Sequence, residues 1–127
     1  NCLTKEMVKT MKEKPIIFAM ANPIPEIMPQ DAKEAGAFIV GTGRSDFPNQ
    51  VNNVLAFPGV FRGALDVRAR RITENMKIQA AYSIANVVKE EELSVDMILP
   101  SPFSKEVVKA VAESIRKAAI EDGVARI

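Results

Sequence analysis

Three asparagines could contact a small ligand: Asn22, which stands where a parallel sheet would present it, and Asn52 and Asn53, which close a run of side-chain amides. Asn22 closely follows the apolar run 16–20, and ligands of open parallel sheets bind just beyond the carboxyl ends of the strands. Its neutral amide suits a hydroxyl, a carboxylate or a ribose. An asparagine before a proline is also typical of a turn in which the amide bonds its own backbone. Position alone therefore leaves ligand contact and a turn role equally open for Asn22.

Four side-chain amides fall within the five residues 49–53, in the order Asn, Gln, Val, Asn, Asn. The apolar residues around them demand partial burial, and buried amides must each find a hydrogen-bond partner. A polar surface loop leading into a helix would explain one amide, because Asn52 or Asn53 alone could serve as the cap. A helix cap accounts for only one of the four amides, so we predict that at least one of them contacts a ligand.

The segment Gly41–Asp46 imitates the start of a dinucleotide phosphate loop, because closely spaced glycines follow an apolar run. The sixth position of that pattern requires a small residue, whereas here it is Asp46. The Phe-Pro pair that follows prevents a helix from beginning at this point. We therefore reject a pyrophosphate site. We predict instead that Thr42 and Gly43 line the nicotinamide or ribose side of a cofactor through their backbone.

The overall composition excludes several classes of function. The chain has 17 Lys plus Arg and 16 Asp plus Glu, a formal charge of +1, which gives no broad field to attract nucleic acid or a membrane. No histidine is present, so Ser-His-Asp chemistry, Cys-His chemistry and His-ligated metals are excluded within this segment. The single cysteine allows no intrachain disulfide, which fits a cytoplasmic protein. A basic cluster indicates a solvated helix end, or at most one arginine on a nucleotide phosphate: Arg62, Arg68, Arg70 and Arg71.

No side chain of the segment shows the pattern of a catalytic group. The carboxylates are not paired at a convincing spacing in an apolar setting. Tyr82, the only tyrosine, lies in the middle of a predicted helix, where packing explains it. We therefore predict no catalytic residue and no metal ligand in this segment.

The elements that must position these side chains follow from the hydrophobic pattern. An apolar run at 16–20, a short helix over 30–35 and a second apolar run at 37–40 predict a compact βαβ unit and a parallel sheet. The first run is apolar at every position, as expected for a strand buried on both faces. The remainder is predicted to be mostly helical, with helices capped by Thr73 and Ser104 and a break at Pro58-Gly59.

Two short parallel strands do not complete a doubly wound sheet, and the chain begins with Asn1 rather than methionine. We therefore expect an α/β fold that is the C-terminal portion of a Rossmann-like doubly wound parallel sheet. The neighbouring strands are expected in sequence that precedes this segment.

Several motifs in a fixed order closely resemble the bacterial and archaeal type of malic enzyme. The resemblance runs from about Leu3 to Ala85, and the order and spacing of the motifs make it specific. The motifs are Ala21-Asn22-Pro23 with Pro25-Glu26-Ile27, then Thr42-Gly43-Arg44-Ser45-Asp46, the run 49–59 (NQVNNVLAFPG) and the run 62–68 (RGALDVR).

The resemblance implies an enzyme that oxidises (S)-malate with NAD or NADP and a Mg or Mn ion, then releases carbon dioxide to leave pyruvate. It implies that Asn22, Asn52 and Asn53 bind malate, and that Asn22 and Asn52 lie beside the nicotinamide. The acid–base tyrosine and lysine, the acidic metal ligands and the glycine-rich loop are expected outside this segment. Residues 1–127 would be part of an NAD(P)-binding domain in a cytoplasmic enzyme, commonly a homodimer, without nucleic-acid or membrane partners.

Two other interpretations remain open from the residues alone. The chain could be an inactive folded module that serves binding or oligomerisation. It could also belong to another NAD-dependent dehydrogenase of small acids or amino acids. The choice between NAD and NADP depends on a residue near the ribose 2′ position, about 20 residues past a glycine loop, so this segment leaves it open.

Overall fold

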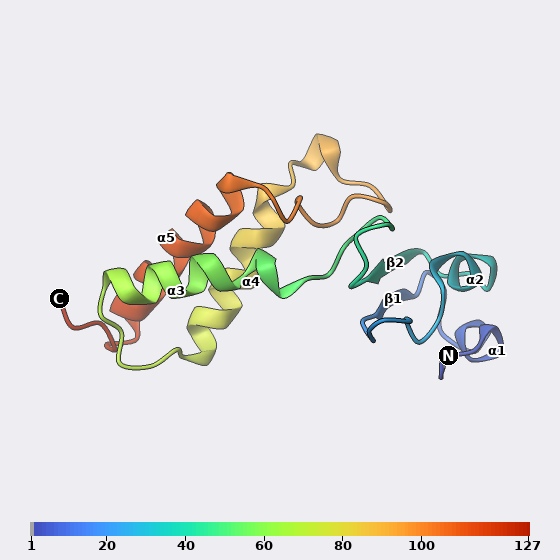
Figure 1. The fold of residues 1–127 in the computed structure, drawn as a ribbon, viewed down its shortest axis with the longest axis horizontal. Helices are drawn as coiled ribbons and strands as arrows, with labels where there is room; N and C mark the ends of the chain where they lie inside the picture. The colour runs from blue at the N-terminus through green and yellow to red at the C-terminus, as the bar shows by residue number, and fades with distance from the viewer. Residues whose placement is uncertain (1) are drawn as a thin grey trace. The chain divides into compact units, whose positions relative to one another are not determined.

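The computed structural model of the chain describes residues 2–127, which form two compact units (Figure 1). The first unit contains the residues up to Asn52 together with Glu92–Ile98. The second contains Asn53–Glu91 and Leu99–Ile127. None of the helices in the described part of the chain combines the length and the apolar character needed to cross a membrane.

The first unit is built around two parallel strands, β1 (Ile16–Ala19) and β2 (Ile39–Thr42). Helix α1 (Lys5–Lys9) precedes β1, and helix α2 (Pro29–Glu34) lies in the connection between the strands. Gly36 follows α2 with φ at 107°, a conformation that suits glycine at the end of a helix. The predicted βαβ unit and its parallel sheet are therefore confirmed, although β2 begins and ends later than the sequence pattern indicated.

Only one face of β1 is buried within the described residues. Ile17 and Ala19 belong to a core formed with residues of α1 and α2, whereas Ile16 and Phe18 are 55% and 48% exposed. The apolar pattern predicted burial on both faces. In residues 2–127 the helices α1 and α2 cover one face of β1, and the apolar side chains Ile16 and Phe18 on the opposite face are exposed.

The second unit is helical, as predicted. It contains the short 3-10 helix η1 (Asn53–Leu55) and the helices α3 (Phe57–Asp66), α4 (Glu74–Val87) and α5 (Lys105–Glu121). A second 3-10 turn, η2 (Glu90–Glu92), follows α4. Figure 1 shows α5 lying against both α3 and α4, and these two contacts dominate the packing of the unit. Its core consists mainly of apolar side chains from these three helices.

The expected break at Pro58-Gly59 is wrong, because both residues lie inside the first turn of α3. A proline in the first turn of a helix removes an N–H that has no partner there in any case. Gly59 and Gly63 form one face of α3 that lies against α5. A Cβ atom on Gly59 would come within 2.6 Å of the Val111 Cβ, and one on Gly63 within 2.5 Å of the Ala112 carbonyl oxygen. The two glycines therefore let the helix backbones approach closely.

The helix starts at Thr73 and Ser104 are confirmed in position. The Thr73 hydroxyl accepts a hydrogen bond from the backbone N–H of Met76 at 3.1 Å, and it also bonds the Asp122 carboxylate beyond the end of α5. Ser104 occupies the corresponding place before α5 but makes no side-chain capping bond.

Candidate functional site

The carboxyl ends of β1 and β2 lead into two loops at the same edge of the sheet. The loop after β1 contains Asn22, which is exposed and precedes a cis peptide bond to Pro23. Within this loop the backbone N–H of Ala21 donates to the Glu26 carboxylate at 2.9 Å. That hydrogen bond is the main reason why the pKa of Glu26 lies below its ordinary value. Glu26 therefore braces the turn that presents Asn22.

The loop after β2 brings Gly43 next to the Asn22 amide, as the strand order predicted. A Cβ atom built on Gly43 would lie 3.5 Å from the Asn22 Oδ1 atom and 3.8 Å from its Nδ2 atom. A larger side chain at position 43 would thus fill the space in front of the amide. Gly43 keeps that space open, which suits the close approach of a flat ligand to the backbone.

Thr42 is fully buried and uses its polar groups to shape the loop. Its hydroxyl accepts a hydrogen bond from the backbone N–H of Arg44 at 3.0 Å, and its carbonyl accepts from the backbone N–H of Val51 at 2.7 Å. The Arg44 guanidinium forms two hydrogen bonds with the Asp46 carboxylate, at 2.9 and 2.7 Å, which hold the pKa of Asp46 below its ordinary value. No helix begins within residues 43–52. These features agree with the rejection of a pyrophosphate cradle.

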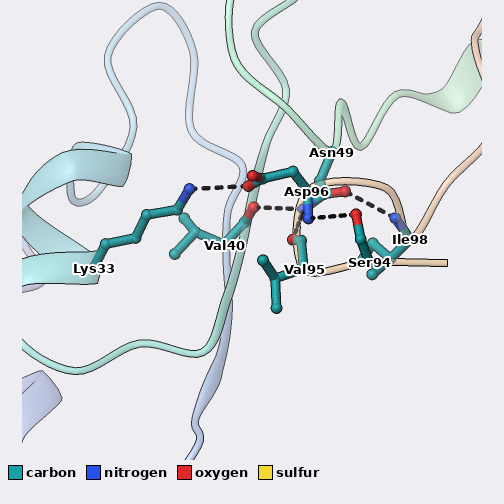
Figure 2. Close-up of polar contacts among 7 residues, drawn as sticks. All are labelled: Lys33, Val40, Asn49, Ser94, Val95, Asp96 and Ile98. Carbon is teal, nitrogen blue, oxygen red and sulfur yellow. Dashed lines mark hydrogen bonds and ion pairs between the residues drawn. The ribbon is translucent and has the colours of Figure 1, made fainter.

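Of the four amides in residues 49–53, Asn49 has a buried side chain and is only 6% exposed. Its Nδ2 group donates to the carbonyl oxygens of Val40 at 3.1 Å and Val95 at 2.8 Å, and its Oδ1 atom accepts from the Ile98 N–H at 3.0 Å (Figure 2). Its φ angle of 57° is one that asparagine tolerates better than most residues. Asn49 therefore fastens the segment 92–98 to the end of β2.

The segment 92–98 is held at a second point as well. The Lys33 ammonium of α2 lies 3.0 Å from the Asp96 carboxylate, and the backbone N–H of Asp96 donates to the Ser94 hydroxyl at 3.3 Å (Figure 2). Lys33 and Asp96 are both about half exposed, so the ion pair adds little stability by itself. Its effect is to orient the turn that Asn49 holds from the other side.

The four amides of 49–53 therefore divide into two kinds. Asn49 bonds backbone groups on three sides, and the Gln50 amide donates to the Gly43 carbonyl at 3.4 Å. Asn52 and Asn53 are exposed. Asn52 is the last residue of this part of the first unit, and Asn53 is the first residue of η1 in the second unit. The sequence pattern assigned no structural role to Asn49 or Gln50, and the fold shows the backbone groups that they bond.

The residues described here fit a nucleotide better than a metal ion. Among residues 2–127 no group of three or more His, Cys, Asp or Glu side chains is placed to hold a metal. The open space at Gly43 beside a neutral amide, at the carboxyl ends of two parallel strands, is the place where α/β sheets of this kind bind nucleotides. The fold is thus that of an α/β domain whose sheet edge is a candidate ligand site.

Comparison with known proteins gives the family. The family model described as "Malic enzyme, NAD binding domain" matches residues 1–120. The chain is 70% identical over 127 residues to the "Bifunctional malic/malolactic enzyme" of Bacillus subtilis, covering 100% of this chain and 31% of that protein. It is 56% identical over 124 residues to the "NAD-dependent malic enzyme" of Geobacillus stearothermophilus, covering 98% of this chain and 26% of that protein. The crystal structure of malic enzyme from Pyrococcus horikoshii matches with a TM-score of 0.94 at 52% identity, covering 98% of this chain and 28% of that one.

The chain belongs to the malic enzyme family and corresponds to its NAD-binding domain. The α/β fold with its small parallel sheet is confirmed as Rossmann-like, and the resemblance of the motifs is confirmed over the whole chain. The chain spans about a third or less of the length of the relatives named here.

Proposed function

We propose that this chain is part of an enzyme that oxidises (S)-malate with NAD or NADP and releases carbon dioxide to give pyruvate. Residues 1–127 would form the C-terminal part of its NAD(P)-binding domain. The observation that carries the proposal is the Asn22 amide beside Gly43, at the edge where both parallel strands end. Membership of the malic enzyme family supports the choice of substrate.

The chain's own residues would bind and orient. An amide can donate to a carboxylate of malate and accept from its hydroxyl without adding charge to a site that already holds ions. We propose that Asn22, Asn52 and Asn53 fix malate so that its C2 hydrogen points toward the cofactor. Asn22 and Asn52 would also border the nicotinamide, together with the backbone of Gly43, while Thr42, which is fully buried, would act by shaping the loop. Positioning of this kind accounts for several powers of ten in rate.

The nicotinamide, when bound, supplies the hydride acceptor. The residues described here contain no group of three or more His, Cys, Asp or Glu side chains placed to bind a metal ion. The Mg or Mn ligands and the acid–base groups that the reaction requires are therefore proposed to lie outside this segment. The exposed apolar face of β1, with Ile16 and Phe18, supports the existence of further protein that covers it. We also propose a cytoplasmic homodimer.

The test is a turnover assay of the full-length protein with malate, Mn²⁺ and either NAD or NADP. We expect absorbance of the reduced cofactor together with carbon dioxide release, and no activity from the isolated 127-residue chain. Comparing the two cofactors assigns NAD or NADP. Reduction of the cofactor by other small hydroxy acids or amino acids, but not by malate, would overturn the proposal in favour of a different dehydrogenase.

A second candidate activity follows from one relative. The Bacillus subtilis protein that is 70% identical carries the name "Bifunctional malic/malolactic enzyme". We propose that the full-length protein also converts malate to lactate and carbon dioxide, without net oxidation. Product analysis by chromatography should then show lactate beside pyruvate. Pyruvate alone, with no lactate at any cofactor concentration, would leave only the oxidative activity.

A further inference from the structure

A hollow of about 430 Å³ lies between α3 and α5 in the second unit. None of the residues that line this α3/α5 hollow is among those assigned to malate. Its volume is within the range typical of small-molecule pockets. Its lining surface is mainly apolar, but five of the seven residues that line it carry a charged group: Arg62 and Asp66 from α3, and Lys105, Lys109 and Arg116 from α5, beside Val108 and Ala112.

The charge of the α3/α5 hollow is strongly one-sided. It contains four cations and one carboxylate, which makes a local formal charge of +3 in a chain whose total is +1. Lys105, Lys109 and Arg116 lie on one stripe of α5, because residues at spacings of four and seven share a helix face. The acidic residues of α5 near this stripe, Glu106 and Glu113, do not line the hollow.

Asp66 holds the two arginines in place without using up their donors. Its Oδ1 atom accepts from the Arg62 Nε at 2.8 Å and from an Arg62 Nη, and its Oδ2 atom accepts from the Arg116 Nη1 at 2.7 Å. A guanidinium has five N–H donors, so both arginines keep most of them for other partners. The side chain of Asp66 is 23% exposed and that of Arg116 is 36% exposed, whereas that of Arg62 is 64% exposed.

The two lysines provide charge that no carboxylate of the described chain neutralises. Lys105 and Lys109 form no ion pair within residues 2–127. An ammonium is a compact charge with three donors, and oriented guanidinium groups bind the oxygens of carboxylates and phosphates. Two guanidinium groups that share the Asp66 carboxylate, and two ammonium groups without an ion pair, together favour an anion of more than one negative charge.

We propose that the α3/α5 hollow binds a small dianion through phosphoryl or carboxyl oxygens. Arg62 and Arg116 supply oriented hydrogen bonds, and Lys105 and Lys109 supply the charge that completes the site. Two sources share this chemistry, a phosphate group and a small dicarboxylate. The proposal does not depend on malate turnover, because it concerns a different part of the fold.

Isothermal titration calorimetry of the full-length protein at low ionic strength tests the site, with inorganic phosphate in one arm and succinate in the other. The variant is Lys105→Gln with Lys109→Gln. Both lysines are exposed, so the fold should be retained and an unchanged unfolding temperature checks this. The control removes the same charge from the first unit, with Lys9→Gln and Lys12→Gln, two exposed lysines outside the hollow.

At least one anion should bind the wild-type protein and the control variant alike, and it should bind the lysine-pair variant about tenfold or more weakly, as for the loss of one charge-assisted hydrogen bond. Affinity should also fall with added salt. A response to phosphate alone assigns a phosphoryl ligand, and a response to succinate alone assigns a dicarboxylate. Malate turnover without added anion should be the same in all three proteins. Equal binding by the wild type and the lysine-pair variant, or no binding of either anion, would overturn the proposal.

Discussion

Replacing Asn49 with alanine removes the side chain that fastens the segment 92–98 to the end of β2. Three backbone groups then lose their partner: the carbonyls of Val40 and Val95 and the N–H of Ile98. The variant also places alanine at a φ angle of 57°, which favours asparagine or glycine. The segment 92–98 should therefore open more often, and the loop that leads to Asn52 should lose its anchor.

The magnitude follows from which groups can reach water. Val40 is 3% exposed, whereas Val95 is 38% exposed, so a water molecule can replace the bond to Val95 but less easily the bond to Val40. A buried group left without a partner costs about 1–3 kcal/mol, and the left-handed backbone adds about 1 kcal/mol for alanine. A local destabilisation on the order of 3 kcal/mol corresponds to a roughly 150-fold larger equilibrium constant for opening.

Hydrogen exchange measured by mass spectrometry on the full-length protein reads this opening at the peptide that contains Ile98. Asn49→Asp keeps the acceptor for the Ile98 N–H but loses both donors, and Asn49→Gly removes all three bonds while relieving the backbone. We expect faster exchange in all three variants, with a smaller increase in Asn49→Gly than in Asn49→Ala because glycine tolerates the backbone conformation. The control is Asn86→Ala, because Asn86 is an exposed asparagine of α4. Wild-type exchange at this peptide in Asn49→Ala would refute the anchoring role.

Three further predictions concern the packing of the helices and the loop after β1. Gly63→Ala should destabilise the protein by about 1–3 kcal/mol in urea unfolding, because its Cβ would meet backbone 2.5 Å away, whereas Leu65→Ala, at a 72% exposed site, should have little effect. The hydrogen bond from the Arg62 guanidinium is the main reason why the pKa of Asp66 lies below its ordinary value near 3.8. The ionised Asp66 carboxylate therefore stabilises the folded protein above that pH, and this stabilisation is lost as the pH falls through the lower pKa of the folded state. Asp66→Asn should therefore flatten the loss of stability measured by acid titration below about pH 4, and an unchanged slope would contradict this. Glu26→Gln should raise KM for malate more than Gln30→Ala, because it weakens the brace of the turn after β1; equal KM values would remove that role.

Most of the first unit could be predicted from the sequence because its signals are local. An apolar run, a proline at the start of α2, a glycine at its end and a second apolar run suffice for a βαβ unit. The placement of Asn22 next to Gly43 follows from that topology, because parallel strands end at the same edge of the sheet.

The sequence could not separate the amides of residues 49–53, because their partners are far along the chain. The Oδ1 atom of Asn49 bonds the backbone of Ile98, and its Nδ2 bonds that of Val95. Pro58-Gly59 was wrongly expected to break a helix for a related reason. The four-residue spacing of Gly59 and Gly63 is explained by the close packing of α5 against α3, which the local sequence does not show. Contacts of this range depend on the whole fold rather than on a local pattern.

The measurement that tests the central claim most directly is kcat/KM for malate in the full-length protein and its asparagine variants. Asn22→Ala, Asn52→Ala and Asn53→Ala are compared with Asn86→Ala, which removes an exposed amide from α4. Loss of substrate positioning should lower kcat/KM by about 100-fold or more in the site variants, while the control keeps the wild-type value. Wild-type kcat/KM in both Asn52→Ala and Asn53→Ala would remove that pair from the site, and the same result in Asn22→Ala would contradict the account as a whole.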